Sequence, residues 1–265
     1  MTLPIHVSAV QYATDLHDKV GNTDKALHLL DDAAHTADLV VMPETSFTGY
    51  WLGKEMARFA ESVPGPMTSI VSEIAVTRNA YICFGIAERD GDRIYNTAVL
   101  VGADGRLVGK HRKAHLFKAD VEAGFTPGDR FDVFETHLGK IGMLVCLDAF
   151  HIESVRVLDL KGAQMVVVPS VGLVIPPWTP ESTLYSWETV LRANAKYGRC
   201  HLVWANKIGT DRGFAAVGNS MVLDRDGRII ARGGSEEEVV RATITLEPKE
   251  PQPGRRPELY GPITE

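Results

Sequence analysis

The feature that most constrains the fold is a short pattern that occurs twice, once in each half of the chain. Residues 37–43 are ADLVVMP and residues 163–169 are AQMVVVP, so both have the form A-x-[LM]-V-V-x-P. A continuous apolar run of this length is typical of a strand that is buried on both faces, as parallel strands covered by helices are. The pattern therefore predicts two similar buried strands.

Each of these strands ends a predicted β-α-β unit. In the first unit, apolar and polar residues alternate over 5–9 as in a strand, and apolar residues recur at helical spacing over 26–34, with Asn22 as the expected N-cap. In the second unit, residues 141–145 form an apolar strand and residues 152–161 have a helical pattern. The chain is therefore expected to consist of two similar halves.

Other segments predict antiparallel strands that extend each sheet. Asp90-Gly91, Asp104-Gly105 and Asp226-Gly227 each lie between apolar runs rich in β-branched residues, which is the signature of a hairpin. Residues 182–197 are amphipathic and predict another helix, and residues 201–205 predict a strand. The expected architecture is an α/β sandwich of sheets covered by helices.

Length and composition fit one large domain. The chain has 265 residues, of which 45% are hydrophobic and 23% are charged, and a chain of this size buries roughly 70–75% of its unfolded surface. No low-complexity segment or linker interrupts it. We expect a single domain over residues 1–265, with the Pro-rich and charged residues 248–265 forming a C-terminal arm.

Charge and cysteine usage exclude several classes of protein. The formal net charge is -6, with acidic and basic residues mixed along the chain, so a general basic surface for nucleic acid is not expected. The N-terminus lacks a basic region, and the longest mostly apolar stretch, 165–178, is interrupted by Ser170 and three prolines, which predicts neither a signal peptide nor a membrane span. Three cysteines without a CxxC motif suggest free thiols in a reducing cytoplasm.

Three reactive side chains follow predicted strands or hairpins, where loops present functional groups on a rigid frame. They are Glu44, Cys146 and Lys113. Taken singly, each fits a structural role: Cys146 as a small buried hydrophobe, Glu44 as a helix cap, and residues 110–115 as a solvated edge strand or an anion patch. Only their combination suggests chemistry.

Several familiar sites are absent from the sequence. It contains no GxGxxG after a strand, no GxSxG, no HExxH and no EF-hand loop, and its nine histidines lack ligand spacing. We therefore expect neither a metal nor a cofactor.

The order and spacing of the motifs resemble those of the nitrilase superfamily of carbon-nitrogen hydrolases. The resemblance covers nearly the whole chain, and implies a four-layer α-β-β-α sandwich of two similar halves. The segments that carry it are Val41–Glu44 with Gly49-Tyr50, Asn96-Thr97, Lys110–Phe117, Phe125–Asp129, Gly142–Asp148, Glu153, Arg156, Gly162-Ala163, Ala205-Asn206, Gly218–Ser220 and Arg255–Tyr260.

The resemblance also implies a catalytic set, in which Glu44 is the general base, Lys113 the family lysine and Cys146 the nucleophile. It places Glu122 as a second carboxylate that holds Lys113 charged and orients the nitrogen side of the substrate. The chemistry agrees with these residue types, because an amide is a poor electrophile and a neutral thiol needs a base during attack. An oxyanion would be held by Lys113 and a backbone N–H after the cysteine.

The residues after the nucleophile indicate the branch of the superfamily. Cys146-Leu147-Asp148 resembles the amide-cleaving branches more than the nitrile-cleaving one. Phe150 stands where many amidase-like members have an arginine that meets an acidic substrate group, which favours a neutral or apolar amide. His151 is either a polar contact for the substrate or an ordinary loop residue.

The sequence thus predicts a thiol hydrolase that cleaves a small amide to an acid and ammonia or an amine. The alternative is an N-carbamoyl amine or amino-acid hydrolase, or a nitrilase. A non-catalytic or acyl-transferring relative is disfavoured by the intact catalytic set. We expect Cys146 to have a lowered pKa and to react with iodoacetamide before Cys83 or Cys200. The resemblance further implies a homodimer or larger assembly that pairs through residues 153–161 and 182–197.

Overall fold

Strand pairing follows the same order in two six-stranded sheets. The computed structural model describes residues 4–250 and 254–261. The first sheet has the order β14 (Glu238–Thr245), β1 (Pro4–Gln11), β2 (Leu39–Val41), β3 (Tyr81–Asp90), β4 (Arg93–Val101) and β5 (Leu107–Arg112). The second has the order β6 (Val133–Thr136), β7 (Gly139–Met143), β8 (Met165–Pro169), β9 (His201–Ala205), β12 (Met221–Leu223) and β13 (Ile229–Arg232).

The two sheets are built alike. In each, three parallel strands, β1-β2-β3 or β7-β8-β9, are flanked by antiparallel strands on both sides. The two sheets differ in where one edge strand comes from. In the second sheet, β6 directly precedes its neighbour β7 in the sequence, whereas in the first sheet β14, the neighbour of β1, comes from the C-terminal part of the chain. The prediction of two similar halves is confirmed.

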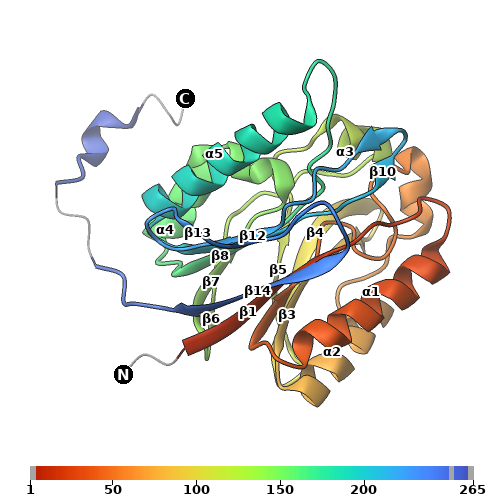
Figure 1. The fold of residues 1–265 in the computed structure, drawn as a ribbon, viewed down its shortest axis with the longest axis horizontal. Coiled ribbons are helices and arrows are strands. Elements are labelled where there is room, and N and C mark those ends of the chain that lie inside the picture. Colours follow the sequence, from red (N-terminus) through yellow and green to blue (C-terminus); the bar gives the residue numbers. More distant parts are fainter. Residues whose placement is uncertain (1–3, 251–253, 262–265) are drawn as a thin grey trace.

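Helices cover the outer face of each sheet (Figure 1). Helices α1 (Lys19–Ala34) and α2 (Pro66–Arg78) pack on the first sheet, and α4 (Ile152–Leu160) and α5 (Pro180–Gly198) on the second. Successive side chains of a strand face opposite sides: Val40 belongs to the apolar cluster beneath α1 and α2, whereas Val41 belongs to the larger cluster that includes residues of both sheets and of α4 and α5. The result is the four-layer α-β-β-α sandwich.

The hairpin predictions are also confirmed, since β3-β4, β4-β5 and β12-β13 are all antiparallel pairs joined at the Asp-Gly dipeptides. The N-cap prediction for the first helix was wrong. Helix α1 begins at Lys19 and is capped by Asp18, whose side chain accepts from the Gly21 N–H. Asn22 lies inside the helix, where its buried amide bonds both backbone groups of Asp15.

The smaller elements lie mostly around the ends of the sheets. They are η1 (Gly53–Arg58), α3 (Lys118–Ala123), η2 (Cys146–Phe150), the hairpin of β10 (Thr210–Asp211) and β11 (Phe214–Ala215), and η3 (Pro257–Leu259). None of the helices in the described ranges is long and apolar enough to span a membrane.

The predicted arm over 248–265 is described only in part, since 251–253 and 262–265 lie outside the described residues. Its first part is tied to the sandwich. Lys249 Nζ lies 2.6 Å from the buried Asp159 carboxylate, and Arg199 donates to the Glu250 carbonyl oxygen at 2.6 Å. The residues of η3 are exposed.

Candidate active site

The three reactive side chains that the sequence singles out emerge at one end of the sandwich. Glu44 follows β2, Lys113 directly follows β5, and Cys146 follows β7 as the first residue of η2. Chemistry in open α/β sheets gathers where parallel strands end.

A buried ion cluster forms the base of the site. Lys113 Nζ lies 2.7 Å from Glu44 Oε1 and 2.7 Å from Asp120 Oδ2, and all three side chains are 0% exposed. The same ammonium lies 3.5 Å from the Tyr50 hydroxyl. One cation thus serves two carboxylates away from water.

Neutral donors complete the cluster. The Asn96 amide donates to Glu44 Oε1 at 2.6 Å and to Asp120 Oδ1 at 2.8 Å. The Val171 N–H donates to Glu44 Oε2 at 3.0 Å. Both oxygens of Glu44 are therefore held in place by donors from separate segments of the chain.

The cluster changes how its members ionise. Burial raises the pKa of Glu44 and the charge of Asp120 raises it further, against the opposing effect of Lys113. Burial alone would lower the pKa of Lys113, but the Asp120 and Glu44 carboxylates raise it well above its ordinary value. Lys113 is consequently a permanent cation, and Glu44 is a stronger base than an ordinary carboxylate.

Cys146 sits in a tight turn at the floor of a cavity. Its φ is 47°, in the left-handed region, and its side chain is nearly buried, with Sγ 3.8 Å from the Val171 carbonyl oxygen. Burial and the Glu44 charge raise the thiol pKa well above its usual value. The expectation of a lowered pKa at Cys146 was therefore wrong, and this thiol needs a base to take its proton.

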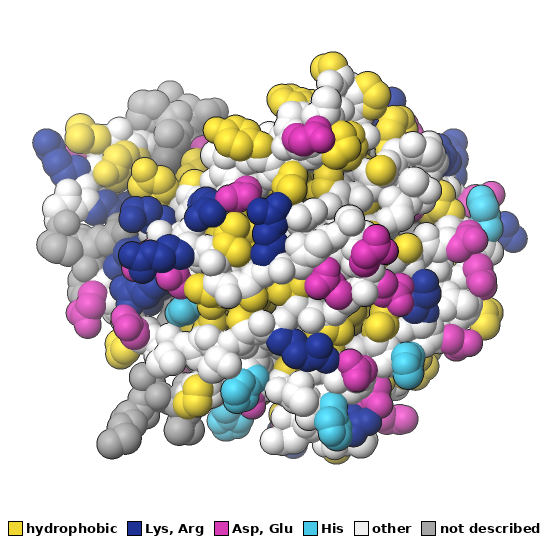
Figure 2. All heavy atoms as spheres, in the orientation of Figure 1, with side chains coloured by type: hydrophobic (Ala, Val, Ile, Leu, Met, Phe, Trp, Pro, Cys, Tyr) yellow, Lys and Arg dark blue, Asp and Glu magenta, His cyan; other side chains and the backbone are white. Residues whose placement is uncertain are grey.

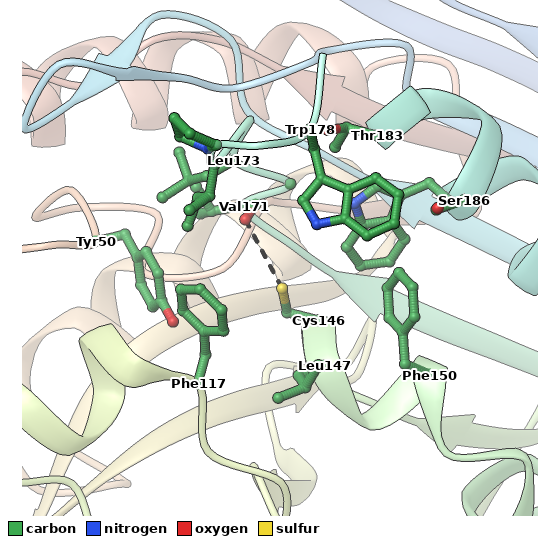
Figure 3. Close-up of a pocket in the computed structure, with 14 residues that line it drawn as sticks. Tyr50, Phe117, Cys146, Leu147, Phe150, Val171, Leu173, Trp178, Thr183 and Ser186 are labelled. Carbon is green, nitrogen blue, oxygen red and sulfur yellow. Dashed lines mark hydrogen bonds between the residues drawn. The ribbon is translucent and has the colours of Figure 1, made fainter. Parts of the chain in front are cut away.

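The cavity above the thiol has a volume of about 360 Å³, near the lower end of the usual range for ligand sites. In Figure 3, Tyr50 and Phe117 lie on one side of Cys146, and Phe150 and Trp178 on the other. Among the described residues, those that line it include no Lys, Arg, Asp or Glu. They are Tyr50, Phe117, Cys146, Leu147, Phe150, Val171, Gly172, Leu173, Ile175, Pro176, Trp178, Thr183, Ser186 and Trp187.

Of the four residues predicted around the nucleophile, Leu147 and Phe150 line this cavity and Asp148 does not. Asp148 is fully buried and joins two loops. Its Oδ1 accepts from the N–H groups of Ala114 and His115 at 3.1 and 2.9 Å, and its Oδ2 from the Val145 N–H at 3.1 Å. It thereby ties the loop after Lys113 to the turn that carries Cys146.

Two imidazoles complete the surroundings of Asp148. His111 Nε2 and His115 Nδ1 each lie 2.8 Å from its carboxylate. Burial opposes ionisation of Asp148, but these contacts hold its pKa well below the usual range. His151 stacks on His115 with ring centroids 3.6 Å apart and is not among the cavity residues.

The structure corrects the position of the second carboxylate. Asp120, and not Glu122, contacts Lys113. Glu122 accepts a hydrogen bond from the Trp51 indole N–H at 2.7 Å and lies 3.6 Å from Arg212, with 36% of its side chain exposed. Residues two apart on a helix point in different directions, and the phase of the six-residue helix α3 decides which acid faces the lysine.

Sequence reasoning missed the roles of Asp120, Asn96, Tyr50 and the Val171 N–H. Asn96 and Tyr50 occur in the motifs that carry the family resemblance, so their positions gave a signal but no role. The Val171 N–H gave none, because it is a backbone group. Among the described residues, no group of three or more His, Cys, Asp or Glu side chains is arranged to hold a metal ion.

Comparison with known proteins identifies similar chains. Residues 6–250 match the family described as carbon-nitrogen hydrolase. The chain is 34% identical over 248 residues to a nitrilase of Pyrococcus abyssi, covering 91% of this chain and 90% of the relative. It is 33% identical over 241 residues to the omega-amidase NIT2 of Xenopus tropicalis, covering 86% and 84%. A solved amidase from Nesterenkonia sp. superimposes with a TM-score of 0.82 at 25% identity, covering 98% and 96%.

The role of Asp148 generates a prediction about stability. Replacing Asp148 with Asn puts an amide where a carboxylate oxygen accepts buried donors, so we expect a loss of about 3 kcal/mol in the free energy of unfolding, measured in urea. The matched control is Asp129→Asn, since the Asp129 side chain is 82% exposed. An Asp148→Asn protein as stable as this control would contradict the joining role.

Proposed function

Because the chain belongs to the carbon-nitrogen hydrolase family, we propose that it hydrolyses a small amide through a thioester formed on Cys146. The observation that carries this proposal is the Glu44–Lys113 pair, buried beside a neutral thiol that opens onto a cavity. The family and its omega-amidase and amidase relatives show a hydrolase that acts on amides. The thioester and the identity of the substrate are our own inference.

In the first half of the reaction, Glu44 takes the thiol proton as the sulfur attacks the amide carbonyl carbon. The carbonyl oxygen becomes an oxyanion. An ammonium group has three N–H donors, and Lys113 directs two of them at Glu44 and Asp120. The third makes only a long contact of 3.5 Å with the Tyr50 hydroxyl, so it can turn to the oxyanion, which the backbone N–H of Leu147 also binds.

The tetrahedral intermediate then collapses. Glu44 returns its proton to the nitrogen, the carbon–nitrogen bond breaks, and ammonia or an amine leaves behind a thioester. In the second half, Glu44 removes a proton from water as the water oxygen attacks the thioester carbon. The carbon–sulfur bond breaks, the carboxylic acid leaves, and the proton from Glu44 restores the thiol.

The cavity favours a neutral, apolar acyl group. A carboxylate on the substrate would lose its hydration among aromatic and aliphatic side chains without gaining a cation, which is costly. Lys113 does not supply that cation, because it is not among the residues that line the cavity. The same argument disfavours N-carbamoyl amino acids and leaves neutral carbamoyl amines and nitriles as alternatives.

Replacement of the nucleophile tests the mechanism. We expect Cys146→Ala to remain folded but to lose amide turnover by at least about 1,000-fold, since the sulfur forms the covalent intermediate. Mass spectrometry of the wild-type protein quenched during turnover should show the acyl mass on Cys146. The control is Cys200→Ala, which removes a buried thiol outside the site, directly before β9. A folded Cys146→Ala protein with more than a few per cent of the wild-type rate would refute the mechanism.

The apolar cavity generates a prediction about selectivity. For amides of equal length, we expect kcat/KM to be about 100-fold higher for an uncharged acyl group than for one that ends in a carboxylate. Phe150 lines the cavity and is 39% exposed, so Phe150→Arg should narrow this ratio, whereas the control Phe150→Leu should not. Equal rates for both classes in the wild-type protein would contradict the assignment.

We also propose that the chain forms a homodimer through the outer face of α4 and α5. This face exposes large apolar side chains, with Leu160 54%, Tyr185 74% and Tyr197 66% exposed. A stable dimer would bury at least about 1,200 Å² in total. Light scattering should give twice the 29.0 kDa chain mass, and a fully active 29.0 kDa particle at micromolar concentration would exclude an obligate dimer.

A further inference from the structure

A second buried lysine, Lys207, bonds the backbone of the residue that follows Glu44. Lys207, in the segment that follows β9, is only 2% exposed, and its ammonium donates to the Thr45 carbonyl oxygen at 3.0 Å and to the Thr14 hydroxyl at 3.0 Å. The proposed reaction steps do not use it. A buried ammonium is costly unless it is paired or hydrogen-bonded, so its position calls for an explanation.

One of its two partners is the carbonyl of Thr45, the residue directly after the proposed base. Thr45 has a φ of 45°, in the left-handed region that a β-branched residue rarely adopts. Such a conformation persists only when its surroundings hold it. The hydrogen bond from Lys207 to the Thr45 carbonyl fixes this turn, and the turn fixes the backbone from which the Glu44 side chain projects.

The close approach of β3 confirms how tightly this turn is held. A Cβ atom on Gly85 would lie 2.6 Å from the Thr45 nitrogen and 2.7 Å from the Glu44 Cα. The backbone of Glu44 and Thr45 therefore packs directly on β3, with Lys207 bonded to the carbonyl of Thr45. Little freedom is left for Glu44 as long as both contacts are made.

The segment around Lys207 holds two further parts of the site. The Asn206 side chain accepts from the Gly172 N–H at 2.7 Å, next to Val171, whose N–H bonds Glu44. The Asp211 carboxylate accepts from the N–H groups of Tyr50 and Trp51 at 3.1 and 3.3 Å. Residues 206–211 thus bond both the loop that follows β2, at Thr45, Tyr50 and Trp51, and the loop that follows β8, at Gly172.

Charge gives Lys207 a second effect. Burial lowers its pKa to about 8, while the charges of Asp211 and Glu44 oppose this lowering, so at neutral pH it is mainly the ammonium. The charged and titratable groups around Glu44 are Lys113, Asp120, Tyr50, Cys146 and Lys207. Asp120 disfavours the ionised form of Glu44, and a nearby cation favours it.

We propose that Lys207 is a positioning residue for Glu44, which holds the turn at Thr45 and favours the ionised carboxylate. The proposal rests on the proposed function, because it assigns Glu44 as the base. It predicts two separate effects: loss of the hydrogen bond to Thr45 lowers kcat, and loss of the positive charge moves the acid limb of the pH profile.

The experiment compares Lys207→Met with Lys207→Gln. Lys207→Met removes both the charge and the donor, so we expect kcat to fall roughly 10- to 100-fold. Lys207→Gln keeps an amide donor for the Thr45 carbonyl and should recover part of this loss. In both variants the acid limb of the kcat/KM profile should move to higher pH, because Glu44 loses a stabilising cation. The control Lys54→Met removes an exposed lysine and should leave the profile unchanged.

A change of opposite sign provides a further check. Asp120→Asn removes a negative charge that raises the pKa of Glu44, so its acid limb should move to lower pH. A purely structural role for Lys207 would lower the folded fraction and the rate together without moving the limb. Unmoved acid limbs in both Lys207 variants would overturn the proposal, and Lys207→Gln decides the matter if Lys207→Met does not fold.

Alkylation of Cys146 separates this proposal from the proposed function. The pH dependence of labelling by iodoacetamide, followed by mass spectrometry, reports proton removal from the thiol without any amide turnover. If the wild-type protein cleaves no amide, the proposed function fails. Lys207 is then judged by labelling alone, where a shift of the acid limb to higher pH in Lys207→Gln supports its role and an unmoved limb refutes it.

Discussion

The buried cluster of Glu44, Lys113 and Asp120 is the constraint on which the rest of the site depends. Removing such charges from water costs several kcal/mol for each ion, and only good geometry with further hydrogen bonds offsets that cost. The three side chains come from the loop after β2, the end of β5 and the short helix α3. The cluster can form only if the fold brings these three elements together, so packing far from the site determines its geometry.

The two halves of the chain meet at this cluster. Pro43 and Pro169 occupy matching places in the repeated A-x-[LM]-V-V-x-P pattern, and the loops that follow them contact each other, since the Val171 N–H bonds Glu44. The pattern that makes the fold predictable therefore also marks two strands whose ends build the site. One loop supplies the carboxylate, and its counterpart supplies a backbone donor that helps to hold it.

Sequence reasoning succeeded where local patterns decide the structure and failed where tertiary packing does. Alternation and Asp-Gly turns predicted the strands and hairpins, and the positions of Glu44, Lys113 and Cys146 followed from motifs. The sequence could not show whether Asp120 or Glu122 faces Lys113, because the sequence of the six-residue helix α3 does not reveal which of its sides packs against the lysine. Lys207 gave no signal at all, since an isolated lysine in a sequence is ordinarily an exposed one.

The charges of the cluster help to explain why the pKa of Cys146, the proposed nucleophile, is raised. The two carboxylates of Glu44 and Asp120 and the one ammonium of Lys113 leave one excess negative charge among side chains that are 0% exposed, and a thiolate at Cys146 would add a second. Burial and the charge of Glu44 accordingly raise the thiol pKa. In the proposed mechanism, the proton passes to Glu44 during attack and the negative charge moves through sulfur to the carbonyl oxygen beside Lys113, so the site never has to hold a free thiolate. A base with a raised pKa suits this coupled transfer better than an ordinary carboxylate, because its affinity for the proton lies closer to that of the thiol.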